Sequence, residues 1–159
     1  MNGGSITGNT CTNEGGIYNL CGGVCVAGGS FTMHGGSITG NTATGSYATT
    51  ASGGVLVYYG GSFTMTGGEI TNNQCAVSNT SGDNGNDFAG GVRVSTTLRG
   101  GTVTVSGDAV ISGNTAANGS ANNVSLANGQ KIKIGGGGLS SGAEIGVTMA
   151  SANVFTTGG

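Results

Sequence analysis

The chain has 159 residues and a formal net charge of −2, and 6% of its residues are charged. Four basic residues are too few for the positive surface that nucleic-acid binding requires. No apolar run approaches the roughly 18 residues of a membrane span, so membrane insertion is not predicted. The 37 glycines could accompany disorder, but a disordered chain usually also carries high net charge. The composition therefore favours a folded β protein.

A repeated phrase sets the organisation of the chain. "GGSITGNT" begins at Gly3, returns at Gly35 and appears again as "GGEITNNQ" at Gly67, a spacing of 32 residues each time. A fourth copy, "GDAVISGNT", begins at Gly107. Met1 occupies the same position in the repeat as Met33 and Met65, and no signal peptide is visible. We therefore expect the sequence to be a segment of a longer protein.

Each repeat contains three short segments in which apolar and polar residues alternate. This alternation is typical of strands, and the glycine doublets between the segments allow tight bends. The first segment centres on one isoleucine, at Ile6, Ile38, Ile70 and Ile111. The second is V-x-V, at Val24/Val26, Val55/Val57, Val92/Val94 and Val124/Leu126. The third is F-x-M, at Phe31/Met33, Phe63/Met65, Val103/Val105 and Ile132/Ile134.

Short strands that recur at a fixed period predict a parallel β-solenoid, in which each strand pairs with its equivalent one coil later. Parallel crossovers are almost always right-handed. We therefore predict an all-β, right-handed parallel β-helix with three short strands per coil and about five coils. Residues 1–134 form the repeats, and residues 135–159 form a degenerate terminal coil or tail. Residues 43–52 and 75–89 are predicted to be loops inserted at one edge.

Asparagines recur at one corner of the predicted coil, at Asn9, Asn41, Asn73 and Asn114. Stacked side-chain amides can hydrogen-bond to one another along such a column, which would satisfy polar groups at an inward corner. We therefore predict a buried structural ladder rather than a ligand site. The V-x-V, F-x-M and isoleucine residues are predicted to point into the bore.

The phrase "GGVLVYYGGSFTMTGGEITNN" resembles the glycine-rich repeats of right-handed parallel β-helix proteins of bacterial surfaces, which are pectin-lyase-like and adhesin-like. The resemblance covers about residues 1 to 126. It implies an extracellular location at the bacterial cell surface. It also implies that a catalytic member would have an acidic cluster for calcium and a basic residue as the base.

Candidate catalytic residues do not form such a group in this sequence. The carboxylates are spread over different parts of the repeat, and His34 has no carboxylate or cysteine partner that would indicate a triad. We therefore predict no catalytic residues and no cofactor. The one candidate metal site is a weak calcium loop in "DNGND", with Asp83 and Asp87, although a full twelve-residue calcium loop is absent.

The four cysteines allow two interpretations. Cys11 and Cys75 share a column two coils apart, about 10 Å at the spacing of stacked strands, which is too far for a disulfide. Cys25 is the outward residue of the first V-x-V segment. A Cys11–Cys21 bridge in an oxidising compartment and four free thiols stay open as alternatives. No C-x-x-C pair indicates structural zinc.

The predicted function is that of a non-catalytic scaffold or adhesin-like module, which contacts host or environmental glycans or proteins through its loops or lateral faces. One alternative is a β-helix that binds or cleaves polysaccharides. Another is a structural unit that associates end to end into filaments. The last is ice binding through two outward threonine columns, Thr32/Thr64/Thr104 and Thr7/Thr39/Thr71.

Overall fold

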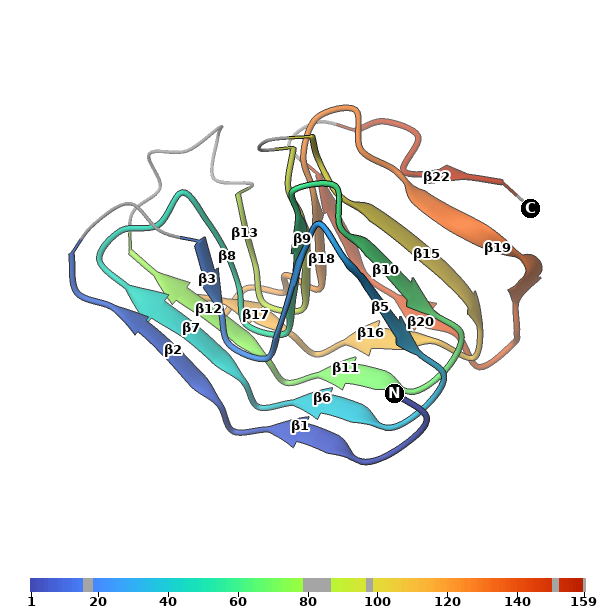
Figure 1. Cartoon of the computed structure of the whole chain (residues 1–159), viewed down its shortest axis with the longest axis horizontal. Coiled ribbons are helices and arrows are strands. Elements are labelled where there is room, and N and C mark those ends of the chain that lie inside the picture. Colours follow the sequence, from blue (N-terminus) through green and yellow to red (C-terminus); the bar gives the residue numbers. More distant parts are fainter. Residues whose placement is uncertain (16–18, 79–86, 97–98, 150–151, 159) are drawn as a thin grey trace.

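The computed structural model describes residues 1–15, 19–78, 87–96, 99–149 and 152–158. Regular structure in these ranges consists of β-strands, and the strands stack in parallel, coil upon coil (Figure 1). The chain is therefore a β-solenoid of about five coils, as the repeat predicts. Among the described residues there is no helix of the length and apolarity needed to cross a membrane.

The strands of each coil follow one another in chain order. The first coil contains β1 (Ser5–Thr7), β2 (Thr10–Asn13), β3 (Asn19–Cys21), β4 (Val24–Ala27) and β5 (Ser30–Met33). The second contains β6 (Ser37–Thr39), β7 (Thr42–Gly45), β8 (Thr50–Ser52), β9 (Val55–Tyr58) and β10 (Ser62–Met65). The third contains β11 (Glu69–Thr71), β12 (Gln74–Val77), β13 (Phe88–Ala89), β14 (Val92–Val94) and β15 (Thr102–Gly107).

The last two coils are shorter. The fourth contains β16 (Val110–Ser112), β17 (Thr115–Ala116), β18 (Val124–Leu126) and β19 (Ile132–Leu139). The fifth contains β20 (Glu144–Ile145), β21 (Val147–Met149) and β22 (Thr156–Thr157). Residues beyond 134 therefore still contribute strands that pair with the preceding coil.

Equivalent strands of successive coils form five parallel sheets, which we call A to E. Sheet A is β1-β6-β11-β16-β20, sheet B is β2-β7-β12-β17, sheet C is β3-β8-β13, sheet D is β4-β9-β14-β18-β21, and sheet E is β5-β10-β15-β19-β22. The register keeps equivalent residues opposite one another, for example Phe31 beside Phe63 and Phe63 beside Val103.

The prediction of three strands per coil needs correction, because the full coils have five. The isoleucine, V-x-V and F-x-M segments form sheets A, D and E. Sheets B and C arise partly from segments that were predicted to be loops, within residues 43–52 and 75–89. Their inward positions are occupied by small residues such as Ala43 and Ala51, which give little apolar contrast in the sequence.

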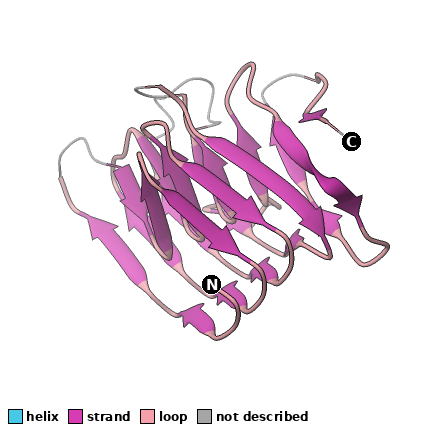
Figure 2. Cartoon of the chain, turned by 45° about the vertical axis from the view of Figure 1, so that its right-hand side comes forward, coloured by secondary structure: helices cyan, strands magenta, loops and turns pink. Residues whose placement is uncertain are grey.

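The stacked strands, seen from another side in Figure 2, surround two separate apolar cores. The main core lies between sheets A, D and E, where the predicted inward residues have no exposed side-chain surface. These are Met33, Ile38, Val55, Val57, Phe63, Met65 and Ile70, with Phe31 half-buried against them. A smaller core between sheets B and C contains Leu20, Ala43, Ala48, Ala51, Cys75, Val77 and Phe88.

Candidate functional site

The four asparagines of the repeat form a continuous hydrogen-bonded ladder beside the main core. Each side-chain Nδ2 donates to the Oδ1 of the next asparagine at 2.9 Å, which links Asn9 to Asn41, Asn41 to Asn73 and Asn73 to Asn114. Asn41, Asn73 and Asn114 are fully buried, whereas Asn9 is exposed. The backbone N–H groups of Asn9, Asn41 and Asn73 donate to the same Oδ1 atoms at 3.0 Å.

The glycine doublets leave room for this ladder. A Cβ on Gly91 would lie 2.8 Å from Nδ2 of Asn114, and one on Gly54 would lie 3.2 Å from Nδ2 of Asn73. In the fourth coil the corresponding residue is Asn123, whose Oδ1 accepts from Nδ2 of Asn114 at 3.0 Å. Asn123 thus provides a last rung that the sequence analysis missed. The signal was the replacement of a glycine doublet by "NN" at residues 122–123.

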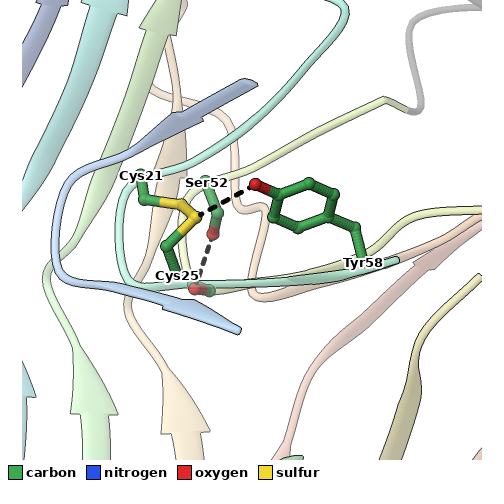
Figure 3. The surroundings of a disulfide bond; sticks show 5 residues. Cys21, Cys25, Ser52 and Tyr58 are labelled. Atoms are coloured by element: carbon green, nitrogen blue, oxygen red, sulfur yellow. Dashed lines mark hydrogen bonds between the residues drawn. A yellow bond between two sulfur atoms is a disulfide. The ribbon is translucent and has the colours of Figure 1, made fainter. Parts of the chain in front are cut away.

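A second arrangement of side chains closes the space between the outer faces of sheets C and D, which we call the seam. In the first coil the seam is crossed by a disulfide between Cys21 and Cys25, whose Cα atoms are 5.6 Å apart, a separation usual for native disulfides. Figure 3 shows the Tyr58 ring beside this bond, with its hydroxyl donating to Sγ of Cys25 at 3.9 Å. The seam explains why outward residues of sheet D are buried.

This disulfide replaces both alternatives that the sequence left open. Cys21 pairs with Cys25 rather than with Cys11, and Cys11 and Cys75 are free. The turn at Gly22 and Gly23 reverses the chain between β3 and β4, and it brings the outward residues of both strands to the same side. Sequence spacing alone did not indicate that reversal.

Higher in the seam, the disulfide is succeeded by other contacts. In the second coil the seam contains Leu56, which has no exposed surface, and Ser52, whose Oγ donates to the Gly91 carbonyl at 2.9 Å. In the third coil Arg93, 1% exposed, forms a salt bridge with Asp87. Its guanidinium also donates to Oγ of Ser125 at 3.2 Å. The seam is thus closed by a disulfide in the first coil, by side-chain packing in the second and by a salt bridge in the third.

Of the two aspartates in the weak calcium candidate, the structure describes only Asp87. Asp87 is occupied by the salt bridge with Arg93, which is a less suitable setting for a cation than a free carboxylate. Asp83 lies outside the described residues. Among the described part of the chain, no three acidic, histidine or cysteine side chains are gathered closely enough to hold a metal ion.

The other candidate groups are separated on the surface. His34 contacts Oγ1 of Thr66 through its Nδ1 at 2.8 Å on an exposed face. The threonine columns stack in register, Thr32 beside Thr64 and Thr64 beside Thr104, with one such threonine per strand. Thr71 donates to Thr39 across the other column at 3.4 Å. Neither arrangement brings an acid and a base together.

No family model, curated protein or solved structure matches this chain. The β-solenoid fold is therefore established by the stacked strands themselves, and the functional argument rests on the side chains.

A pocket of about 380 Å³ opens where the smaller core ends. Sheet C has no strand in the fourth coil, because the chain turns back after β17 in a tight hairpin with an antiparallel bridge between Thr115 and Ala121. The hairpin lies over the end of the smaller core that no further strand of sheet C covers. The pocket is lined by Cys75, Val77, Ser78, Phe88, Ala116, Ala117, Asn118, Ser120, Ala121, Asn122 and Thr148.

Burial raises the pKa of the Cys75 thiol in this pocket to about 11, because desolvation disfavours the thiolate more than backbone hydrogen bonds favour it. Cys75 is 3% exposed. The thiol is therefore neutral at physiological pH and contributes an apolar surface rather than a nucleophile.

The stability of the protein is expected to fall as the pH rises from 9.0, the ordinary pKa of the thiol, to about 11. A raised pKa in the folded state gives stability below the unfolded pKa that is lost as the pH rises through the folded value. The loss should be about 1.4 kcal/mol per pH unit in that window. Denaturant melts at several pH values measure it.

Cys75→Ala is the matched control, because Ala43 and Ala116 occupy the same column in the neighbouring coils. Every other ionisable group is present in both proteins, so the difference between the two curves isolates Cys75. Parallel pH curves for the two proteins would contradict the assignment.

Proposed function

We propose that this chain is a non-catalytic, extracellular β-solenoid segment of a bacterial surface protein. It serves as a rigid scaffold and contacts glycans or proteins through its loops or lateral faces. The observation that carries this proposal is the Cys21–Cys25 disulfide, which joins two strands of the coil. Such bonds form and persist in oxidising compartments outside the cytoplasm. The adhesin-like repeat phrases support the bacterial surface as that location.

Rigidity is supported by the way in which polar groups are satisfied inside the solenoid. The asparagine ladder runs through the coils with hydrogen bonds of 2.9 Å between side chains, and buried networks of this kind hold one arrangement when every member is paired. Apolar columns and parallel strand pairing repeat the same connection from coil to coil. A solenoid of this type transmits its geometry along the axis and suits a spacer.

Disulfide mapping tests the extracellular assignment. Cleavage after glutamate separates residues 1–14, 15–69 and 70–144, so Cys11, the Cys21–Cys25 pair and Cys75 fall on different peptides. In chain exported to a bacterial periplasm, we expect peptide 15–69 to resist alkylation until it is reduced. Peptides 1–14 and 70–144 should each take one alkyl group after denaturation.

Chain from a reducing cytoplasm is the control, in which all four cysteines should be alkylated. Free Cys21 and Cys25 in the exported protein would remove the main support for the proposal. A linked pair of peptides 1–14 and 15–69 would instead indicate that Cys11 is bridged to Cys21 or Cys25.

Incubation with pectins and other acidic glycans tests the non-catalytic part of the proposal. We expect no cleavage products, because the described carboxylates and His34 are not assembled into an acid–base site. Chromatography of the glycans before and after incubation is the measurement. Turnover that Asp87→Asn abolishes, while the fold persists by circular dichroism, would make the chain a polysaccharide-cleaving enzyme.

End-to-end association is a second candidate, supported by the edge of the first coil. Within the described part of the chain, strands β1, β2, β4 and β5 each pair on one side only, with β6, β7, β9 and β10. Unpaired strand edges readily add further strands, and a head-to-tail contact of this kind extends into filaments. Light scattering at rising concentration should show growing particles, whereas a constant monomer mass would exclude this assembly.

A further inference from the structure

The tip of the hairpin that follows β17 carries a short sequence of polar residues, Asn118-Gly119-Ser120. An asparagine that is followed, one residue later, by a serine or threonine is the acceptor sequence of N-linked glycosylation, provided that it lies on an exposed segment. Asn118, Gly119 and Ser120 are all exposed. The hairpin tip therefore meets both the sequence requirement and the requirement for access.

Hydrogen bonds within the tip hold the side-chain amide of Asn118 in one orientation. Its Oδ1 accepts from the backbone N–H of Ser120 at 3.0 Å and from Oγ of Ser120 at 2.7 Å. Since a backbone N–H can only donate, reversing the amide would place one donor against another. Among the described residues, no acceptor binds Nδ2 of Asn118. The oxygen is therefore engaged within the turn, and the nitrogen is available.

The structure distinguishes Asn118 from the two other matches to the acceptor sequence. Asn123 begins a second match, which ends at Ser125. Oδ1 of Asn123 accepts from Nδ2 of Asn114 at 3.0 Å, as the last rung of the ladder, and Ser125 is 1% exposed. The third match, at residues 79–81, lies outside the described residues. Of the two described matches, only the one at Asn118 is accessible in the folded chain.

We propose that Asn118 is an acceptor site for an N-linked sugar. In the transfer, Nδ2 of Asn118 attacks the anomeric carbon of a sugar that is activated as a phosphate ester. The bond from Nδ2 to the anomeric carbon forms, and the bond from that carbon to the phosphate oxygen breaks, with its electron pair leaving on the phosphate. One proton of Nδ2 passes to a base of the transferase. The assignment rests on the hairpin tip alone and is independent of the scaffold role.

UDP-glucose, together with a soluble N-glycosyltransferase that recognises asparagine-x-serine, is the probe for the folded chain. Cleavage after lysine and arginine then gives peptide 100–131, which contains Asn118 and Asn123. By mass spectrometry with fragmentation, we expect one hexose at Asn118 and roughly tenfold less at Asn123, because Asn123 reaches the enzyme only when the coil opens. The free peptide has no fold that hides Asn123, so it should accept sugar at both asparagines.

A second exposed turn provides an internal control for the role of the hydroxyl. Asn128 and Gly129 are exposed, and Gly129 has a φ of 79°, compared with 78° for Gly119. The residue that follows is Gln130, so this turn lacks the serine. Asn128 should stay unmodified, and Asn128→Gln should accept sugar at Asn118 as the parent chain does.

Ser120→Ala keeps Asn118 but removes the hydroxyl that the transferase recognises, so we expect it to abolish transfer to Asn118. Circular dichroism confirms that the variant is folded, and Asn118→Gln gives the same test by removing the acceptor itself. Three results would overturn the proposal: no sugar on Asn118 of the folded chain, equal transfer to Asn118 and Asn123 in the folded chain, or sugar on Asn118 that persists in folded Ser120→Ala.

Discussion

Replacing Phe63 with alanine is expected to lower the free energy of unfolding by about 3–5 kcal/mol, as for other fully buried aromatic residues. Phe63 has no exposed surface and lies in the centre of sheet E. Its ring stacks on that of Phe31, with centroids 5.6 Å apart. The truncation removes this contact and leaves a cavity. The closely packed residues around it cannot readily move in to fill that cavity.

Thr64→Ala is the control, because Thr64 is the next residue on the same strand and points to the other side. Its loss should be well under about 1 kcal/mol, as for a surface substitution. Urea melts of the two variants, fitted with a common slope, give the comparison. Equal losses would mean that the inward and outward phases of β10 are assigned wrongly.

Replacing Asn73 with alanine is expected to cost about 3 kcal/mol or more, because each buried polar group left without a partner costs roughly 1–3 kcal/mol. The Asn73 Oδ1 accepts from the backbone N–H and the side-chain Nδ2 of Asn41. Its Nδ2 donates to Oδ1 of Asn114 and to the Ile38 carbonyl, both at 2.9 Å. The substitution therefore interrupts the ladder on both sides at once.

Asn9→Ala offers a matched comparison within the same ladder. Asn9 is exposed and its side chain donates to Asn41 at one end of the series, so water can replace the lost bond. We expect a loss of about 1 kcal/mol or less. Denaturant melts compare the two variants, and a similar loss at both positions would show that burial adds nothing to the ladder.

The parts of the fold that could be predicted are those in which large apolar residues recur. Sheet E could be recognised from Phe31, Phe63 and Val103, because each is followed by a threonine and this pattern repeats from coil to coil. Sheets B and C gave no comparable signal, because their inward positions include Ala43, Ala51 and Cys75, and small residues contrast little with the serines and threonines beside them. The number of strands per coil was therefore underestimated.

The seam and the pocket depend on how the coil folds back on itself, which local patterns do not encode. Arg93 and Leu56 occupy the outward phase of sheet D, and the alternation rule places such residues in solvent. They are buried because sheet C returns alongside. The pocket arises from the early reversal of the chain after β17, a topological event rather than a motif.

The direction of the amides in the asparagine ladder gives the solenoid a polar axis. Every side-chain bond of the ladder runs from Nδ2 of the earlier asparagine to Oδ1 of the later one, so the first coil presents the Oδ1 acceptor of Asn9, while Asn123 ends the series at the other side. Two first coils placed face to face would oppose one acceptor to another. A further coil stacked below Asn9 is compatible only if its own amides point the same way. Any extension of this structure is therefore one-way, and the two ends of a stack would remain chemically distinct at every length.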